Sequence, residues 1–236
     1  ALWLGIEDMT GALVKKGQSV DKTLEAFDLL CQIGISPMPM MMHHDAQPFY
    51  TRGKPEGLYN QVKLLRKAGA VSLQVLMVTP SAGSKLYEDT FRSGMVYDSV
   101  AGRRVEDHMY DGNFVIASHA PKPWRKQLNL TLAYLSFYNI FRMIGLMLRR
   151  RNLLSRKRIM LQILGILGLG YTIRRTTGWL FRLLTGRIER LSRPTYSAIP
   201  MRSVDGGIAS HDLPAMMVPF DEPAPPSAPA AQPQNA

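Results

Sequence analysis

The sequence predicts an α/β protein: a parallel sheet covered by helices, followed by basic helices and a disordered tail. Three observations predict this fold class. Strand-like and helix-like patterns alternate through residues 1–118, bases gather in residues 119–193, and residues 194–236 are rich in Pro and Ala. We take these ranges as a parallel α/β unit, a helical extension, and a segment with too little apolar surface to fold.

The first predicted strand is Leu2–Ile6, an apolar run that stops at the acidic residues 7 and 8. A helix is predicted over Val20–Ile33, because apolar residues recur there at helical spacing, and Ser19 or Asp21 would cap its start. Since the sequence begins within a strand, we expect either that its N-terminus was removed by processing or that this chain is the downstream part of a longer polypeptide.

Two more strands and a second helix follow. The strands are the apolar runs ISPMPMMMHHD, residues 35–45, and VSLQVLMVTP, residues 71–80. The helix is Pro55–Ala68, with Pro at its start and Gly69 just beyond its end. Strands that are apolar on both faces and joined by helices form parallel sheets. The strand Leu2–Ile6 would leave an exposed edge on such a sheet, so we expect the isolated chain to be poorly soluble.

Polar residues follow each predicted strand at its carboxyl end. They are Glu7 and Asp8, then His43 to Asp45, then Thr79 to Gly83. Because ligands of parallel α/β folds bind at this edge, the three strand ends predict one side of a binding site. The alternative is that they are ordinary solvated loop residues. A metal site at His43 and His44 is disfavoured, because adjacent side chains of a strand point to opposite faces.

Several short motifs, in this order, resemble the C-terminal half of a radical S-adenosylmethionine (SAM) barrel. They are GIED at 5–8, QIGI at 32–35, LLRKAG at 64–69 and VLMVTPSAGSKLYEDTFRSGMV at 75–96. The family pattern T-P-x-P-G-T-x-L-Y is matched at Thr79, Pro80, Gly83, Leu86 and Tyr87. Ala82 and Ser84 depart from it. YDGN at 110–113 is similar to an element of the subgroup that carries a cobalamin-binding domain.

The resemblance implies that residues 1–118 are the C-terminal half of a parallel, TIM-like (βα) barrel, so that the fold is a partial barrel, with site residues at the three strand ends. Glu7, or else Asp8, would bind the ribose of SAM, since a carboxylate accepts hydrogen bonds from hydroxyls. His43 would lie near the adenine or methionine part, although MMMHHD departs from the family's usual sequence at this strand.

The third strand end would contact adenine through the backbone of Val78, Thr79 and Pro80, and Gly83 would allow close approach. No catalytic residue is identified. Tyr110 and Asp111, in an acidic segment expected to cover the barrel mouth, are weaker site candidates.

The cofactors that the resemblance implies are SAM, a [4Fe–4S] cluster and cobalamin. The family's C-x-x-x-C-x-x-C motif and a cobalamin-binding domain are both absent from this sequence. A cluster needs several thiolates, and the one cysteine, Cys31, is predicted to be a small buried hydrophobe. The implied partner is therefore the missing N-terminal half of the same polypeptide, and we expect this chain alone to be inactive.

Charge sets the helical extension apart. The formal net charge is +11, but residues 122–193 hold sixteen Lys or Arg and one acid, hence +15, which leaves −4 for the rest. Two apolar runs, Leu128–Leu148 and Ile159–Ile173, lie among these bases. The helices would dock on an anionic membrane surface, pack on the barrel with Arg outward, or bind nucleic acid. The apolar content disfavours nucleic acid, and each base near an anionic membrane contributes about 1 kcal/mol.

Three functions fit these patterns unequally. The resemblance favours part of a cobalamin-dependent radical SAM enzyme that methylates or otherwise remodels an unactivated carbon, on a lipid-type substrate by analogy with the subgroup. It would be cytoplasmic and peripheral to the inner face of the membrane. The alternative is a complete, non-catalytic α/β module with a membrane-docking basic tail. A small TIM-like hydrolase is a weaker third hypothesis, because no nucleophile–base set is evident.

Overall fold

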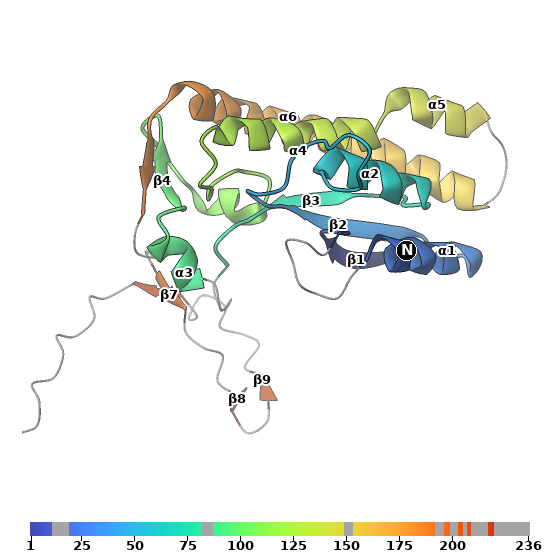
Figure 1. The fold of residues 1–236 in the computed structure, drawn as a ribbon, viewed down its shortest axis with the longest axis horizontal. Coiled ribbons are helices and arrows are strands. Elements are labelled where there is room, and N and C mark those ends of the chain that lie inside the picture. Colours follow the sequence, from blue (N-terminus) through green and yellow to red (C-terminus); the bar gives the residue numbers. More distant parts are fainter. Residues whose placement is uncertain are drawn as a thin grey trace, which may run out of the picture.

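The structure, a computed structural model, describes residues 1–10, 19–81, 87–148 and 153–191, with 196–198, 203–204, 207–208 and 217–219 (Figure 1). The first elements are β1 (Leu2–Glu7), α1 (Val20–Gln32), β2 (Pro37–His43), α2 (Leu58–Lys67) and β3 (Gln74–Met77). Then come α3 (Tyr87–Arg92), β4 (Tyr97–Val100), β5 (Arg103–Arg104), a 3-10 turn (Asp107–Asp111), α4 (Pro123–Phe137), α5 (Ile140–Leu148), α6 (Leu153–Thr185) and β6 (Ile188–Arg190).

The three first strands form one parallel sheet in the order β1-β2-β3. The predicted parallel β-α-β-α-β arrangement is thus confirmed, and Ser19 caps α1 by accepting a hydrogen bond from the Lys22 N–H at 3.3 Å. The finer prediction of a partial barrel is not confirmed. The next strand, β4, pairs antiparallel with β5 and β6 in a separate sheet.

Both faces of β2 are covered, but unequally. Its odd-numbered residues, from Pro37 to His43, are buried, whereas Met38, Met40 and Met42 are half-buried. Met41 belongs to the main core, together with residues from α2, β3, α4 and α6. Because the strand is apolar on both sides, its sequence could not tell which face meets the core.

The outer edge of β3 is occupied by two tyrosines of the α4 region. The Tyr134 hydroxyl accepts a hydrogen bond from the Val75 N–H (2.9 Å) and donates to the Val75 carbonyl (3.0 Å). Tyr138 makes the same pair of bonds with Leu73, at 2.8 and 2.9 Å. Backbone groups that another strand would bind are therefore satisfied by phenols, and α4 is fixed along this edge.

The basic helical extension packs on the α/β unit. α4 and α6 lie side by side above the sheet in Figure 1, and both contribute to the core that contains the strands. In α6, the Trp179 indole N–H donates to the Val115 carbonyl at 3.0 Å, and Gly165 lies against the Tyr138 ring. The interpretation of helices packed on the α/β unit therefore holds for the buried faces of α4 and α6.

Within the described residues, no helix has both the length and the apolar character that crossing a bilayer requires.

The predicted disordered tail lies mostly outside the described residues. Its described parts are four short strands: β7 (Tyr196–Ala198), β8 (Ser203–Val204), β9 (Gly207–Ile208) and β10 (Met217–Pro219). β7 pairs antiparallel with β10, and β8 with β9.

Removing the edge-binding hydroxyl should destabilise the fold. Tyr134→Phe leaves the buried N–H and carbonyl of Val75 without their partner, so we expect the free energy of unfolding to fall by about 1–3 kcal/mol. Urea denaturation measures this difference. Tyr50→Phe, which removes a hydroxyl from an exposed ring, is the matched control and should change it little. An equal loss in both variants would contradict the role of Tyr134.

Two glycines of α6 should respond oppositely to alanine. A methyl at Gly165 would collide with the Tyr138 ring, whereas one at Gly168 meets open space. We expect Gly165→Ala to cost about 1–3 kcal/mol through overpacking. Gly168→Ala should instead raise stability by about 0.5–1 kcal/mol, because alanine favours a helix interior. Thermal unfolding of the two variants side by side tests the packing of α6 on α4.

Candidate functional site

The carboxyl ends of β1 and β2 bring several charged and polar groups together beside α4. The His44 imidazole, just after β2, is within electrostatic reach of Lys126, Asp8, Glu7 and Asp45. These groups come from two strand ends and one helix. The predicted convergence of polar residues at this edge is therefore present for the first two strands.

The end of β1 has an unusual backbone. The register of β1 against β2 shifts between Gly5 and Glu7, and Glu7 has a φ of 55°, in the left-handed region. Non-glycine residues seldom adopt this region, and such outliers, like bulges, concentrate at functional sites. The bulge therefore sets Glu7 apart from an ordinary strand residue.

Asp8 is held inside the protein. Its Oδ1 accepts hydrogen bonds from Gln61 Nε2 at 2.5 Å and from the Thr10 hydroxyl at 2.9 Å. Gln61, which lies in α2, also accepts a hydrogen bond from the Met9 N–H at 3.1 Å. Asp8 thus fixes the turn after β1 to α2.

His43 is fully buried and bonded on both sides. Its Nδ1 lies 2.9 Å from Gln47 Oε1, and its Nε2 lies 3.2 Å from the Asn129 amide nitrogen. Since an amide oxygen accepts and an amide nitrogen donates, the proton belongs on Nδ1. Burial lowers the pKa of His43 to about 4, so the ring is neutral at pH 7.

Asp45 forms a partly buried ion pair with Lys126 of α4. Its Oδ1 accepts from Lys126 Nζ at 2.5 Å and from the Ser118 hydroxyl at 2.7 Å, and its Oδ2 accepts from the His119 N–H at 2.7 Å. Burial raises the pKa of the Asp45 carboxyl, but the hydrogen bonds from Lys126 and Ser118 outweigh burial and hold it below its usual value. The carboxylate therefore stays charged and anchors the segment at Ser118 to β2.

His44 retains unused bonding capacity, as does the Nε2 of Gln47. The Nε2 of His44 is buried and has no hydrogen-bond partner among the described residues. Burial, followed by the charge of Lys126, lowers the pKa of His44. A buried nitrogen with no partner is unfavourable, so it marks a place where a polar group of a ligand would be stabilised.

The carboxyl end of β3 is only partly covered by the described residues. Val78 and Thr79 are half-buried and Pro80 is buried, whereas Gly83 lies outside the described residues. The YDGN segment runs beside this end, because the Met77 N–H donates to the Gly112 carbonyl at 2.7 Å.

Of the two weaker candidates in that segment, Asp111 forms an ion pair with Arg175 of α6 at 3.1 Å. Tyr110 is partly exposed, and burial raises the pKa of its phenol.

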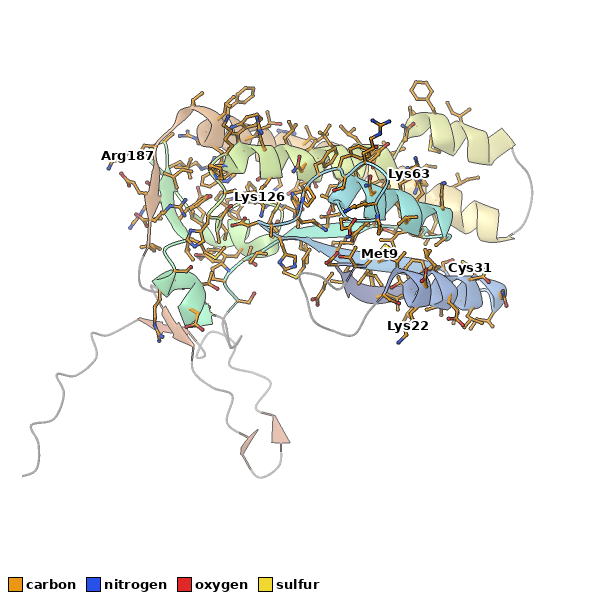
Figure 2. All side chains as sticks on the ribbon, in the orientation of Figure 1. Met9, Lys22, Cys31, Lys63, Lys126 and Arg187 are labelled. Atoms are coloured by element: carbon orange, nitrogen blue, oxygen red, sulfur yellow. The ribbon has the colours of Figure 1, made fainter. Side chains whose placement is uncertain are left out.

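The residues do not fit an iron–sulfur cluster. Cys31 is the one cysteine of the chain, and its Sγ lies 3.9 Å from the Ala68 carbonyl, where α1 and α2 end. Figure 2 shows Cys31 and Lys126 near opposite ends of the sheet. Within the described ranges, no group of three or more His, Cys, Asp or Glu is arranged to hold a metal ion.

No protein-family model, curated protein or solved structure matches this chain. The assignment of residues at the carboxyl edge therefore depends on geometry and on the motifs in the sequence. The roles predicted for Glu7, Asp8, His43 and residues 78–80 stay predictions. Sequence reasoning missed Gln61, Lys126 and Asn129, since each stands within a helix and outside any motif.

The burial of His43 should make stability depend on pH. The unfolded imidazole takes up a proton near pH 6.5, whereas the folded one does so only near pH 4. Stability is therefore greatest above pH 6.5 and falls as the pH drops toward 4, by at most about 1.4 kcal/mol per unit for this residue. His43→Gln, which does not titrate, should show a smaller slope in urea denaturation at several pH values.

The contribution of Asp45 lies lower on the pH scale. Because the pKa of the Asp45 carboxyl is lowered in the folded protein, its ionised form stabilises the fold above pH 3.8. That stabilisation is lost only as the pH falls below this value. A slope between pH 6.5 and 4 that is identical in the wild type and His43→Gln would contradict a buried, neutral His43.

Proposed function

We propose that this chain is the C-terminal part of a radical SAM enzyme of the cobalamin-binding subgroup, and that the carboxyl edge of β1 and β2 contacts the nucleoside of SAM. The observation that carries the proposal is the bulged, positive-φ Glu7 beside a buried His44 nitrogen that has no described partner. The ordered motifs from GIED to YDGN support it. In the longer protein, β1–β3 would be the later strands of the barrel.

The residues present fit a nucleoside better than a metal. Glu7 offers carboxylate oxygens that can accept from ribose hydroxyls, and His44 Nε2 offers a buried nitrogen for a polar atom of the adenine or ribose. Thr79 would add a half-buried hydroxyl from the third strand end. His43 and Asp8 would act indirectly, because their hydrogen bonds hold the two strand ends in place.

The SAM and cluster would supply the radical that activates an unreactive carbon, and this chain's residues would orient the nucleoside. Thiolates for the cluster and any cobalamin site would come from the preceding part of the polypeptide. The reaction in this proposal is methylation or another remodelling of an unactivated carbon, with a lipid-type substrate. The enzyme would act in the cytoplasm.

A second candidate is a non-catalytic α/β module. It is favoured by the extent to which Asp8, Asp45 and His43 are bonded to Gln61, Lys126, Gln47 and Asn129 within the protein. Such complete pairing is typical of residues that hold a fold together. The two candidates differ in what they require of the coding sequence before Ala1.

The proposal predicts an in-frame C-x-x-x-C-x-x-C motif in the coding sequence upstream of Ala1. In the longer protein, reconstituted with its cluster, we expect Glu7→Gln to weaken SAM binding by about tenfold, because a ribose hydroxyl loses a charged acceptor. Isothermal titration calorimetry measures the affinity, and the electron paramagnetic resonance signal of the reduced cluster reports whether SAM has bound.

The matched control is Glu25→Gln, which changes an exposed carboxylate on α1. It should leave the SAM affinity unchanged. An upstream stop codon, or equal SAM affinity in the wild type and Glu7→Gln, would overturn the proposal, and a stop codon would favour the second candidate.

A further inference from the structure

The outward face of α6 is apolar over most of the helix. Large exposed side chains recur at helical spacing, with Leu167 66% and Tyr171 63% exposed. We call this set the α6 stripe: Met160, Ile163, Leu164, Leu167, Tyr171, Phe181 and Leu184. At a rise of 1.5 Å per residue it extends over about 36 Å. Protein surfaces normally carry apolar residues that are scattered singly, whereas these form one continuous row.

The stripe reverses the usual polarity of a surface helix. The side of α6 that meets the protein carries Leu169, Trp179 and Leu183, but also the buried polar residues Gln162 and Thr176. Surface helices of water-soluble domains place polar residues outward instead. The outward apolar residues of α6 therefore need an explanation other than the packing of the core.

The neighbouring helix extends this apolar surface. α5, which packs against α6, exposes Ile140, Phe141 and Ile144, and Phe141 is 79% exposed. Both helices therefore present large apolar side chains to their surroundings.

The bases around the stripe show which partner fits. Arg174 is exposed within the outward face of α6 and Arg187 lies just beyond its end (Figure 2), and neither forms an ion pair with a described residue. Arg175 and Arg182, in contrast, donate to Asp111 and the Ala101 carbonyl. In the sequence, six further bases occupy residues 149–158, and Glu189 is the one acid between 122 and 193.

We propose that the α6 stripe lies on the surface of an anionic lipid bilayer, with its apolar side chains among the acyl chains and the bases at the headgroups. An apolar face bordered by Arg and Lys has the chemistry of an interfacial helix. A second copy of this chain fits less well, since two such faces would bring like charges together. This inference does not depend on the proposed enzymatic function.

Vesicle flotation of the full chain tests the proposal. Vesicles of phosphatidylcholine alone, or mixed with phosphatidylglycerol, serve as the probes. We expect the wild type to float with the anionic vesicles, and added salt to weaken binding. The double variant Leu164→Gln/Leu167→Gln should bind these vesicles about tenfold less, because it removes apolar surface from the centre of the stripe.

The matched control is Leu29→Gln/Ile33→Gln, which changes two exposed apolar residues, Leu29 in α1 and Ile33 at its C-cap, 55% and 70% exposed. It should float like the wild type. Equal melting temperatures would show that both variants are folded, because all four positions are exposed. A wild type that does not float with anionic vesicles overturns the proposal, as does equal flotation of the α6 and α1 variants. A dimer that only the α6 variant dissociates, without flotation, would identify a second copy as the occupant.

Discussion

The rest of the structure depends on the hydrogen bonds between two phenols and the edge of β3. Tyr138 binds Leu73 and Tyr134 binds Val75, so α4 runs antiparallel to β3. The first turns of α4 are therefore carried to the carboxyl edge of the sheet, where Lys126 meets Asp45 and Asn129 meets His43. The later turns give α6 a surface to pack on. One edge contact thus decides both the composition of the candidate site and the position of the helical extension.

The α/β pattern of residues 1–81 could be predicted because its signals are local. Apolar spacing predicted α1, with Ser19 at its start, and Pro55 and Gly69 marked the limits of α2, which begins at Leu58 in the structure. The position of α4 could not be predicted, since hydroxyls of Tyr134 and Tyr138 that bind backbone some sixty residues away leave no periodic trace. The same limit applies to the barrel, because strand-like segments do not reveal the sheet in which a later strand, such as β4, will pair.

The residues of the candidate site at strand ends could be predicted from the sequence, whereas those in helices could not. A polar residue at the end of a buried strand is conspicuous, as at Glu7 and His43. Lys126 and Gln61 stand in helices, where charged and amide residues ordinarily face water, so nothing in the sequence distinguishes these buried partners. Strand alternation separated His43 from His44 but could not decide which one enters the core, because β2 is apolar on both faces.

The phenols on β3 also determine the edge at which another strand can join the sheet. The β3 edge is occupied by Tyr134, Tyr138 and the Gly112 carbonyl. In contrast, β1 has no second strand partner in the described part of the chain and carries exposed Leu2 and Trp3. Any strand that joins this sheet, from the same polypeptide or another, has to arrive at β1. Correct assembly and aggregation would therefore both proceed by strand addition at the β1 edge, and a segment that covers β1 would block both.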